Sequence, residues 1–143
     1  MILDQLPHGS VVVVDTAPVI YLLEANATFL PLFLPLFRAA ERGEIQILLT
    51  PVTLAEVLAG PLKARKEALA ERYESALREG LGWRVVDLNA DLAAKAARLR
   101  IRYGLKLPDA FQLAAALVHS AQALVSHDRD FGQAAKEMPI LGI

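Results

Sequence analysis

Short runs rich in β-branched and apolar residues alternate along this chain with longer stretches of helical character. The runs cover residues 11–14, 45–50, 83–88 and 123–126, with a short last one around Ile140 and Leu141. They are largely continuous in apolar residues, as is typical of parallel strands buried on both faces. This order of elements predicts an α/β fold, a three-layer α/β/α sandwich with a mostly parallel central sheet.

Helices are expected at 62–79, 90–103 and 108–119, from apolar spacing and from residues that start or stop helices. Asn89 is expected to cap the second, Gly104 to end it, and Pro108 stands in the first turn of the third. The first carries charges of alternating sign and ends at Gly80 and Gly82. Its inward side is marked by Leu62, Leu69, Tyr73 and Leu77.

The longest apolar run, residues 27–37, is interrupted by Pro31 and Pro35. It is far shorter than the roughly 20 residues that a membrane span requires. Leu30, Phe33, Leu34 and Phe37 recur at helical spacing and would form one apolar face. That face either packs on the core or binds a partner.

Composition excludes several classes of protein. The 143 residues are 55% hydrophobic, enough for one compact domain over 1–143 with a buried core. The absence of cysteine excludes disulfides, thiolate zinc sites and cysteine nucleophiles. The first ten residues lack the basic start and apolar segment of a signal peptide, so we expect a cytoplasmic protein without a membrane anchor.

Four acidic residues stand in apolar surroundings where an acid is costly to bury: Asp15, Glu56, Asp109 and Asp128. Such carboxylates persist when they are paired, hydrogen-bonded or bound to a cation. Asp15 and Asp128 follow predicted strands, and the carboxyl ends of parallel strands are where ligands bind in open α/β sheets. If these two strands are neighbours, both side chains enter one cleft.

The other two acids are expected on helices. Asp109 falls in a first helical turn, where the helix dipole favours an anion, and a plain helix-start role is the alternative. Glu56 is the only charged residue from 51 to 61, and it either faces a metal or simply faces solvent. All four acids offer oxygen ligands, which Mg²⁺ or Mn²⁺ prefer, and no histidine or cysteine cluster favours zinc. Thr16, Ser126 and Asp130 are auxiliary candidates beside them.

The segments VVVVDTAPVIYLLE, TPVTLAEVLAG, LPDAFQLAAAL and ALVSHDRDF resemble the successive motifs of the PIN-domain family, especially the VapC-type toxins of bacterial toxin–antitoxin pairs. The resemblance covers nearly the whole chain, although Ser126 stands where threonine is usual. It implies a Mg²⁺- or Mn²⁺-dependent endoribonuclease whose acidic constellation is Asp15, Glu56, Asp109 and Asp128. It also implies a homodimer and a small antitoxin partner.

An RNA substrate also needs cationic contacts, because the net charge of −1 provides no general attraction. The candidates lie in one block without acids that leads to Asp109: Lys95, Arg98, Arg100, Arg102 and Lys106. A solvated basic face without a partner is the alternative. An aspartyl phosphatase or a phosphate-accepting receiver is disfavoured, because the DxD motif of the first and the paired acids and late lysine of the second are missing. A catalytically silent PIN-like module that only binds partners remains the alternative function.

Overall fold

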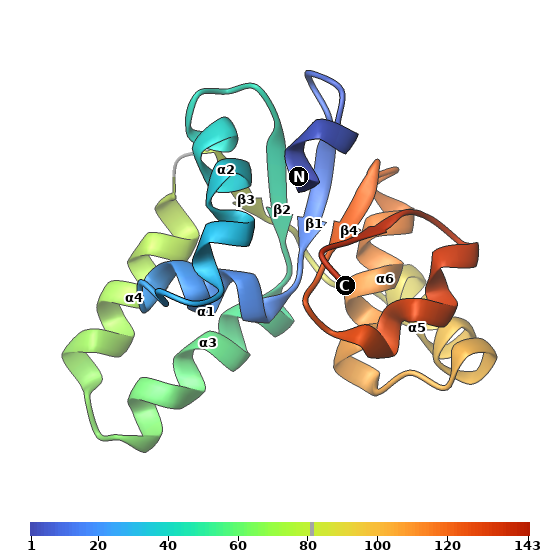
Figure 1. Ribbon diagram of the computed structural model, residues 1–143. Coiled ribbons are helices and arrows are strands. Elements are labelled where there is room, and N and C mark those ends of the chain that lie inside the picture. Colours follow the sequence, from blue (N-terminus) through green and yellow to red (C-terminus); the bar gives the residue numbers. More distant parts are fainter. Residues whose placement is uncertain (81) are drawn as a thin grey trace.

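The computed structural model describes residues 1–80 and 82–143, which form a parallel sheet flanked by helices (Figure 1). The strands are β1 (Val11–Val14), β2 (Gln46–Leu49), β3 (Trp83–Val85), β4 (Ala123–Val125) and β5 (Ile140–Leu141). The α-helices are α1 (Thr16–Leu23), α2 (Leu30–Glu41), α3 (Pro51–Lys63), α4 (Glu67–Glu79), α5 (Ala90–Tyr103) and α6 (Leu107–Val118). Two 3-10 helices are η1 (Ile2–Gln5) and η2 (Arg129–Lys136).

The sheet has the order β3-β2-β1-β4-β5, and every strand pair is parallel. The predicted α/β/α sandwich is therefore confirmed. The strands are shorter than predicted at 45–50, 83–88 and 123–126, because the flanking residues curve into loops once the ladder ends. Thr50 illustrates this, since it serves as the residue that precedes α3.

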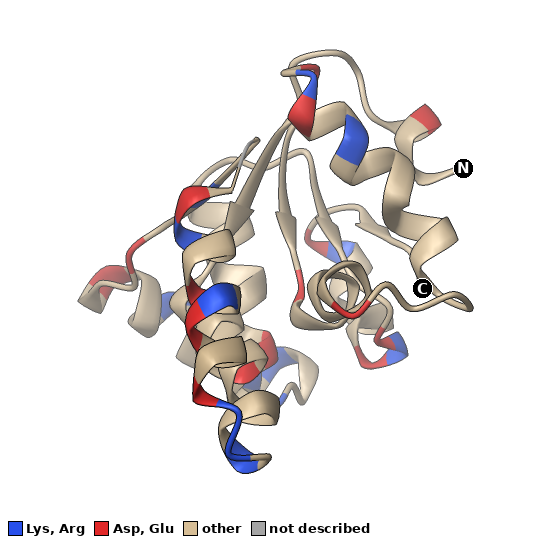
Figure 2. Cartoon of the chain, turned by 90° about the vertical axis from the view of Figure 1, so that its left-hand side faces the viewer, with Lys and Arg blue, Asp and Glu red and all other residues tan. Residues whose placement is uncertain are grey.

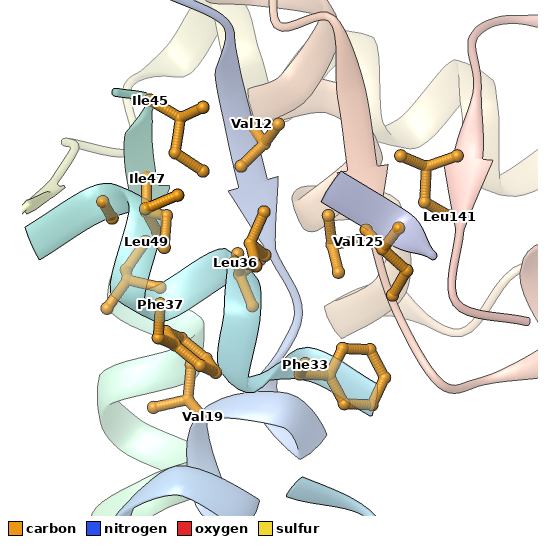
Figure 3. Packing of buried hydrophobic residues seen from close by; sticks show 14 of the residues in the cluster. Val12, Val19, Phe33, Leu36, Phe37, Ile45, Ile47, Leu49, Val125 and Leu141 are labelled. Carbon is orange, nitrogen blue, oxygen red and sulfur yellow. The ribbon is translucent and has the colours of Figure 1, made fainter. Parts of the chain in front are cut away.

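Alternate strand residues divide the core into two clusters, one on each face of the sheet. Val13, Leu48 and Leu124 pack against α5, α6 and η2. Val12, Ile47 and their neighbours pack on the opposite face against α1, α2 and parts of α3 and α4, as Figure 3 shows around Phe33, Leu36 and Phe37. This alternation, which follows from the two-residue period of a strand, produces the three layers.

The predicted helix over 62–79 is wrong in its bounds, because two helices meet there. α3 ends at Lys63 and α4 begins at Glu67, with Arg65 in the left-handed region at φ 57°. The run of mixed charges begins at Lys63, the last residue of α3, and continues through α4, so it spans the break between the helices without marking it. Leu62, expected to point inward, is exposed, whereas Leu77 is buried. Figure 2 shows acidic and basic residues intermixed on α4.

Other helix signals are confirmed. The Asn89 side chain accepts a hydrogen bond from the backbone N–H of Leu92 at 2.9 Å, and Gly104 ends α5 in the left-handed conformation. The run over 27–37 contributes the first two turns of α2, with Phe33 and Phe37 buried. Among the described residues, no helix combines the length and hydropathy needed to cross a bilayer.

Two glycines with nearly the same positive φ provide a test of how tightly α2 packs on β3. An added Cβ on Gly82 (φ 87°) would lie 2.3 Å from the backbone oxygen of Ala40, whereas one on Gly9 (φ 86°) meets nothing within 4 Å. Gly9→Ala should cost roughly 1 kcal/mol through φ strain alone. Gly82→Ala should cost at least about 3 kcal/mol, because the clash adds to it. Urea unfolding of the two variants measures the difference, and equal losses would contradict this packing.

Candidate metal centre

The site lies at the carboxyl ends of β1 and β4, where the order of strands reverses direction. From β1 the chain proceeds to β2 on one side, while β4 pairs with β1 on the other. Asp15 follows β1 directly, and its backbone N–H bonds to the carbonyl of Val125 at 2.8 Å. The adjacency expected for the two strands is thus confirmed, and Asp15 and Asp128 flank one topological switch point.

Asp15 is the buried member of the group, with 7% of its surface exposed. The Ser126 hydroxyl donates to its Oδ2 at 2.9 Å, and the Gln112 amide donates to its Oδ1 at 3.2 Å. Burial raises the pKa of Asp15, opposed by hydrogen bonds from the Thr16 backbone, Ser126 and Gln112. The charge of Glu56 raises it further. These donors are what makes an anion tolerable in this position.

Glu56 lies on α3, exposed to solvent but hydrogen-bonded to the residue after Asp15. Its side chain is exposed, yet Oε1 accepts a hydrogen bond of 2.6 Å from the hydroxyl of Thr16. Thr16 itself is buried and follows Asp15 in the chain. Glu56 is therefore held toward the other acids while one side of it remains open to solvent.

Asp109 occupies the first turn of α6 and is half-buried. The pKa of Asp109 is raised to about 6, first by burial and then by the charges of Asp15, Asp128 and Glu56. Lys106 opposes them. A helix N-terminus alone would favour the anion, so desolvation and three like charges outweigh the dipole here. All four predicted acids thus interact around Asp109.

Asp128 precedes η2 and makes the local capping contact that the sequence allowed. Its Oδ1 accepts from the backbone N–H of Asp130 at 2.9 Å, and its own N–H donates to Ser126 Oγ at 2.9 Å. Ser126 thus joins Asp15 to the Asp128 loop. Asp130 is exposed and contributes its backbone to this turn.

The donor set fits a hard divalent cation, since it consists of carboxylate oxygens whose mutual repulsion a positive charge would relieve. In the part of the chain that the structure describes, however, no three acidic or histidine side chains already stand at metal-ligating positions. Binding an ion would therefore draw these carboxylates together by side-chain rotation. Glu56, exposed on one side, and the half-buried Asp109 have room for it.

Sequence reasoning missed a buried polar cluster beneath the acids. Gln112 is fully buried; its Oε1 accepts from the Thr50 hydroxyl at 2.8 Å, and its Nε2 donates to Thr53 Oγ1 at 2.7 Å. Thr53 Oγ1 lies 3.2 Å from Thr16 Oγ1. A glutamine in the apolar run AFQLAAALV, one helical turn after Asp109, was the available signal. The hydrogen-bond partners of this glutamine lie after β2 and on α3, and the run itself does not identify them.

Two of the predicted basic residues bind groups of the protein itself. Arg102 donates to Glu137 at 2.6 Å, and Arg98 donates to the Ala94 carbonyl at 3.2 Å on α5. Lys106 is the member close enough to lower the pKa of Asp109. The five residues therefore divide between the outer surface of α5 and the entrance to α6.

An aromatic cluster supports the Asp128 loop. The hydroxyl of Tyr21 and Nδ1 of His127 lie 2.8 Å apart, and the His127 ring packs edge-on against Tyr21, Phe29 and Phe33. Through these contacts His127, which lies between Ser126 and Asp128, packs against α1 and α2.

Solved structures with the same fold include toxins of toxin–antitoxin systems. A toxin–antitoxin complex from Klebsiella pneumoniae contains a chain 26% identical to this one, with a TM-score of 0.61 over 84% of this chain and 89% of that one. VapC20 of Mycobacterium tuberculosis, a sarcin–ricin loop cleaving toxin, has a TM-score of 0.70 at 20% identity, covering 86% and 94%. A chain of Rickettsia felis VapBC2 bound to promoter DNA has a TM-score of 0.67 at 16% identity, covering 91% and 96%.

The likenesses to VapC20 and to VapBC2, both under 25% identical, establish the fold alone. None of the curated proteins compared with the chain matches it. A sequence model of the PIN domain matches residues 12–137. PIN domains are nucleases and generally use divalent metal ions. The resemblance seen in the four motifs is confirmed. Since the match spans most of the sequence and includes all four acids, this chain belongs to the PIN domain family.

Proposed function

We propose that this protein is a Mg²⁺- or Mn²⁺-dependent endoribonuclease and the toxin of a type II toxin–antitoxin pair. The observation that carries the proposal is the gathering of Asp15, Glu56, Asp109 and Asp128 at one edge of the sheet, where Ser126 links Asp15 to Asp128 and Thr16 holds Glu56. Burial and the charges of the other three acids raise the pKa of Asp109 to about 6. A fold seldom keeps four mutually repelling carboxylates at one sheet edge unless a cation offsets them.

Asp15, Glu56, Asp109 and Asp128 would hold the ion, and a bound divalent cation makes a water nucleophilic and offsets the charge that develops on phosphate. Asp15 is fixed by Ser126 and Gln112 and would define the position of the site. Glu56, exposed on one side, leaves that side accessible to a polynucleotide. Lys106, whose charge lowers the pKa of Asp109, would contact a substrate phosphate.

The RNA substrate is supported by the motif resemblance and by the structural likeness to VapC20, a toxin that cleaves the sarcin–ricin loop. Lys95, Arg98, Arg100 and Arg102 lie exposed along α5 and would supply salt-sensitive attraction for RNA phosphates. Metal titration distinguishes the nuclease from the alternative, a catalytically silent PIN-like module, because a module that acts only through partners need not bind Mg²⁺.

For the antitoxin, an apolar groove of about 300 Å³ lies at the start of α2 and is lined by Ala25, Asn26, Ala27, Leu30, Pro31, Leu34, Pro35 and Arg38. A second, of about 270 Å³, shares Leu34 and Arg38 with it. We assign these grooves to an apolar segment of a small antitoxin whose basic side chain reaches the acids. The toxin–antitoxin complexes among the similar structures support this assignment, and a homodimer is proposed on the same resemblance.

Replacing a metal-holding acid by its amide should abolish metal-dependent RNA cleavage. We expect Asp15→Asn and Asp109→Asn to lower the cleavage rate at least about 100-fold, because each removes an anionic ligand. Asp91→Asn is the matched control, since Asp91 is also a first-turn helix acid but lies on α5 and is exposed. Cleavage of an RNA pool in Mg²⁺ and in EDTA measures the effect. Full activity in folded Asp15 and Asp109 variants would refute the assignment.

The metal-free protein should lose stability as the pH rises from about 4 to above 6. The pKa of Asp109 is raised from 3.8 to about 6, so the fold favours the protonated acid and loses that contribution as Asp109 ionises. The difference corresponds to roughly 3 kcal/mol, which solvent screening at a half-exposed group reduces to on the order of 1 kcal/mol. The raised pKa of Asp15 acts in the same direction.

Thermal melts of metal-stripped protein at pH 5 and pH 7.5 measure this loss. Asp109→Asn should reduce it and should melt higher than the parent at pH 7.5. Mg²⁺ should raise the midpoint of the parent and much less that of the variant, by mass action on the folded state. A variant that melts lower than the parent without metal, with an unchanged response to Mg²⁺, would show that Asp109 is only a helix-start residue.

The groove assignment is tested with two leucines of α2. Leu34 lines both grooves, whereas Leu32 is exposed on the same helix and lines neither. Leu34→Arg should weaken binding of the antitoxin encoded by a neighbouring reading frame at least about tenfold, since a charge would replace an apolar contact. Leu32→Arg should change it less than about threefold. Equal effects, measured by calorimetry, would remove these grooves as the binding surface.

A further inference from the structure

The hydrogen bonds beneath the acids have directions that can be deduced one by one. The Thr16 hydroxyl has a single hydrogen, and it donates this to Glu56 Oε1 at 2.6 Å. In the 3.2 Å contact between the hydroxyls of Thr16 and Thr53, Thr53 must therefore be the donor. Thr53 Oγ1 then accepts from Gln112 Nε2 at 2.7 Å.

The orientation of the Gln112 amide follows from the same reasoning. Its Oε1 accepts from the Thr50 hydroxyl, and its two N–H groups point to Thr53 Oγ1 and to Asp15 Oδ1. A flipped amide would place Oε1 against the carboxylate of Asp15, two acceptors without a hydrogen between them. All donors thus run from Thr50 through Gln112 toward two carboxylates.

We propose that Gln112 is a positioning residue that couples Asp15 to Glu56 through hydrogen bonds and so orients both carboxylates as ligands for a divalent cation. The inference rests on the proposed function, since it names a supporting residue of the same site. Gln112 is fully buried on α6 and acts through Asp15 and through the hydroxyls of Thr53 and Thr16.

Packing alone does not account for a glutamine at this position. Its neighbours Leu113, Ala114 and Ala115 are apolar and fully buried, so an apolar side chain would suit the core. The cluster is also complete: among the described residues, no buried side-chain nitrogen or oxygen lacks a hydrogen-bond partner. Removing the amide would leave Thr50, Thr53 and Asp15 each short of one partner, in a place where water is excluded.

The first test compares Gln112→Met with Leu113→Met, two substitutions of similar size at adjacent buried positions of α6. Mn²⁺ titration by calorimetry at pH 7.5 should show at least about tenfold weaker binding for Gln112→Met, because Asp15 and Glu56 lose their fixed orientation. Leu113→Met, which perturbs packing only, should stay within about twofold of the parent. Parent-like Mn²⁺ affinity in a folded Gln112→Met variant would overturn the inference.

A second pair of variants interrupts the series of hydrogen bonds at Thr53. It provides a test even if Gln112→Met does not fold. Thr53→Val keeps the shape but removes the hydroxyl between Gln112 and Thr16, and Thr53→Ser restores the hydroxyl. Thr53→Val should weaken Mn²⁺ binding about threefold to tenfold, and Thr53→Ser should recover most of the affinity. Equal affinities for valine and serine variants would show that the hydroxyl relay has no role.

A measurement without metal separates this inference from the proposed function. The side-chain amide protons of Gln112 should exchange with solvent at least about 100-fold more slowly than those of exposed Gln133, because they are buried and bonded. Rapid exchange at Gln112 would overturn the network. A parent protein that binds no Mn²⁺ would instead overturn the proposed function, while the exchange rates still decide whether Gln112 holds Asp15.

Discussion

The desolvation of Asp15 is the constraint on which the rest of the site depends. A carboxylate with 7% exposure between two apolar strands is costly unless donors surround it. The donors come from three separate parts of the chain: the backbone of Thr16, the hydroxyl of Ser126 after β4 and the amide of Gln112 on α6. The acid can therefore be satisfied only when β1, β4 and α6 have assembled, which links the site to completion of the core.

The acids around Asp15 work against the fold in the absence of a cation. Asp109 has its pKa raised to about 6 by burial and by three like charges, and Lys106 offsets them only in part. Repulsion among these carboxylates thus lowers the stability of the metal-free fold, and such destabilisation is a common feature of functional sites. The two apolar clusters on the faces of the sheet, with Phe33 on one side and Phe131 on the other, supply the opposing stabilisation.

The site is also held from both faces of the sheet. Gln112 and Asp109 approach it from α6, which belongs to one layer, whereas Thr16 and Glu56 approach from α1 and α3, which contribute to the other. Ser126 joins them at the sheet itself, and the His127 ring fastens its loop to Tyr21 and Phe29. Because the α2 grooves lie near Asn26 and Leu30, a partner seated there would contact the same layer that holds Glu56.

Many of the strands, helix ends and site residues could be predicted from the sequence, because they depend on local chemistry. Strand cores such as 11–14, the helix cap at Asn89 and the isolated acids Asp15 and Asp109 carry signals within a few residues. The reversal between α3 and α4 could not be predicted, since Arg65 adopts a left-handed conformation that no local residue demands. Nor could the ion pair between Arg102 and Glu137, which lie 35 positions apart in the sequence.

By itself, then, the sequence determined which side chains carry the charge and where the strand cores and several of the helices lie, because desolvation cost and periodicity act locally. Only the tertiary structure decided which of those side chains meet. The order β3-β2-β1-β4-β5 makes β1 and β4 neighbours, and with them Asp15 and Ser126, across 111 positions of sequence. The role of Gln112 beneath the acids was decided in the same way, because a buried amide must pair with donors and acceptors that other elements place around it.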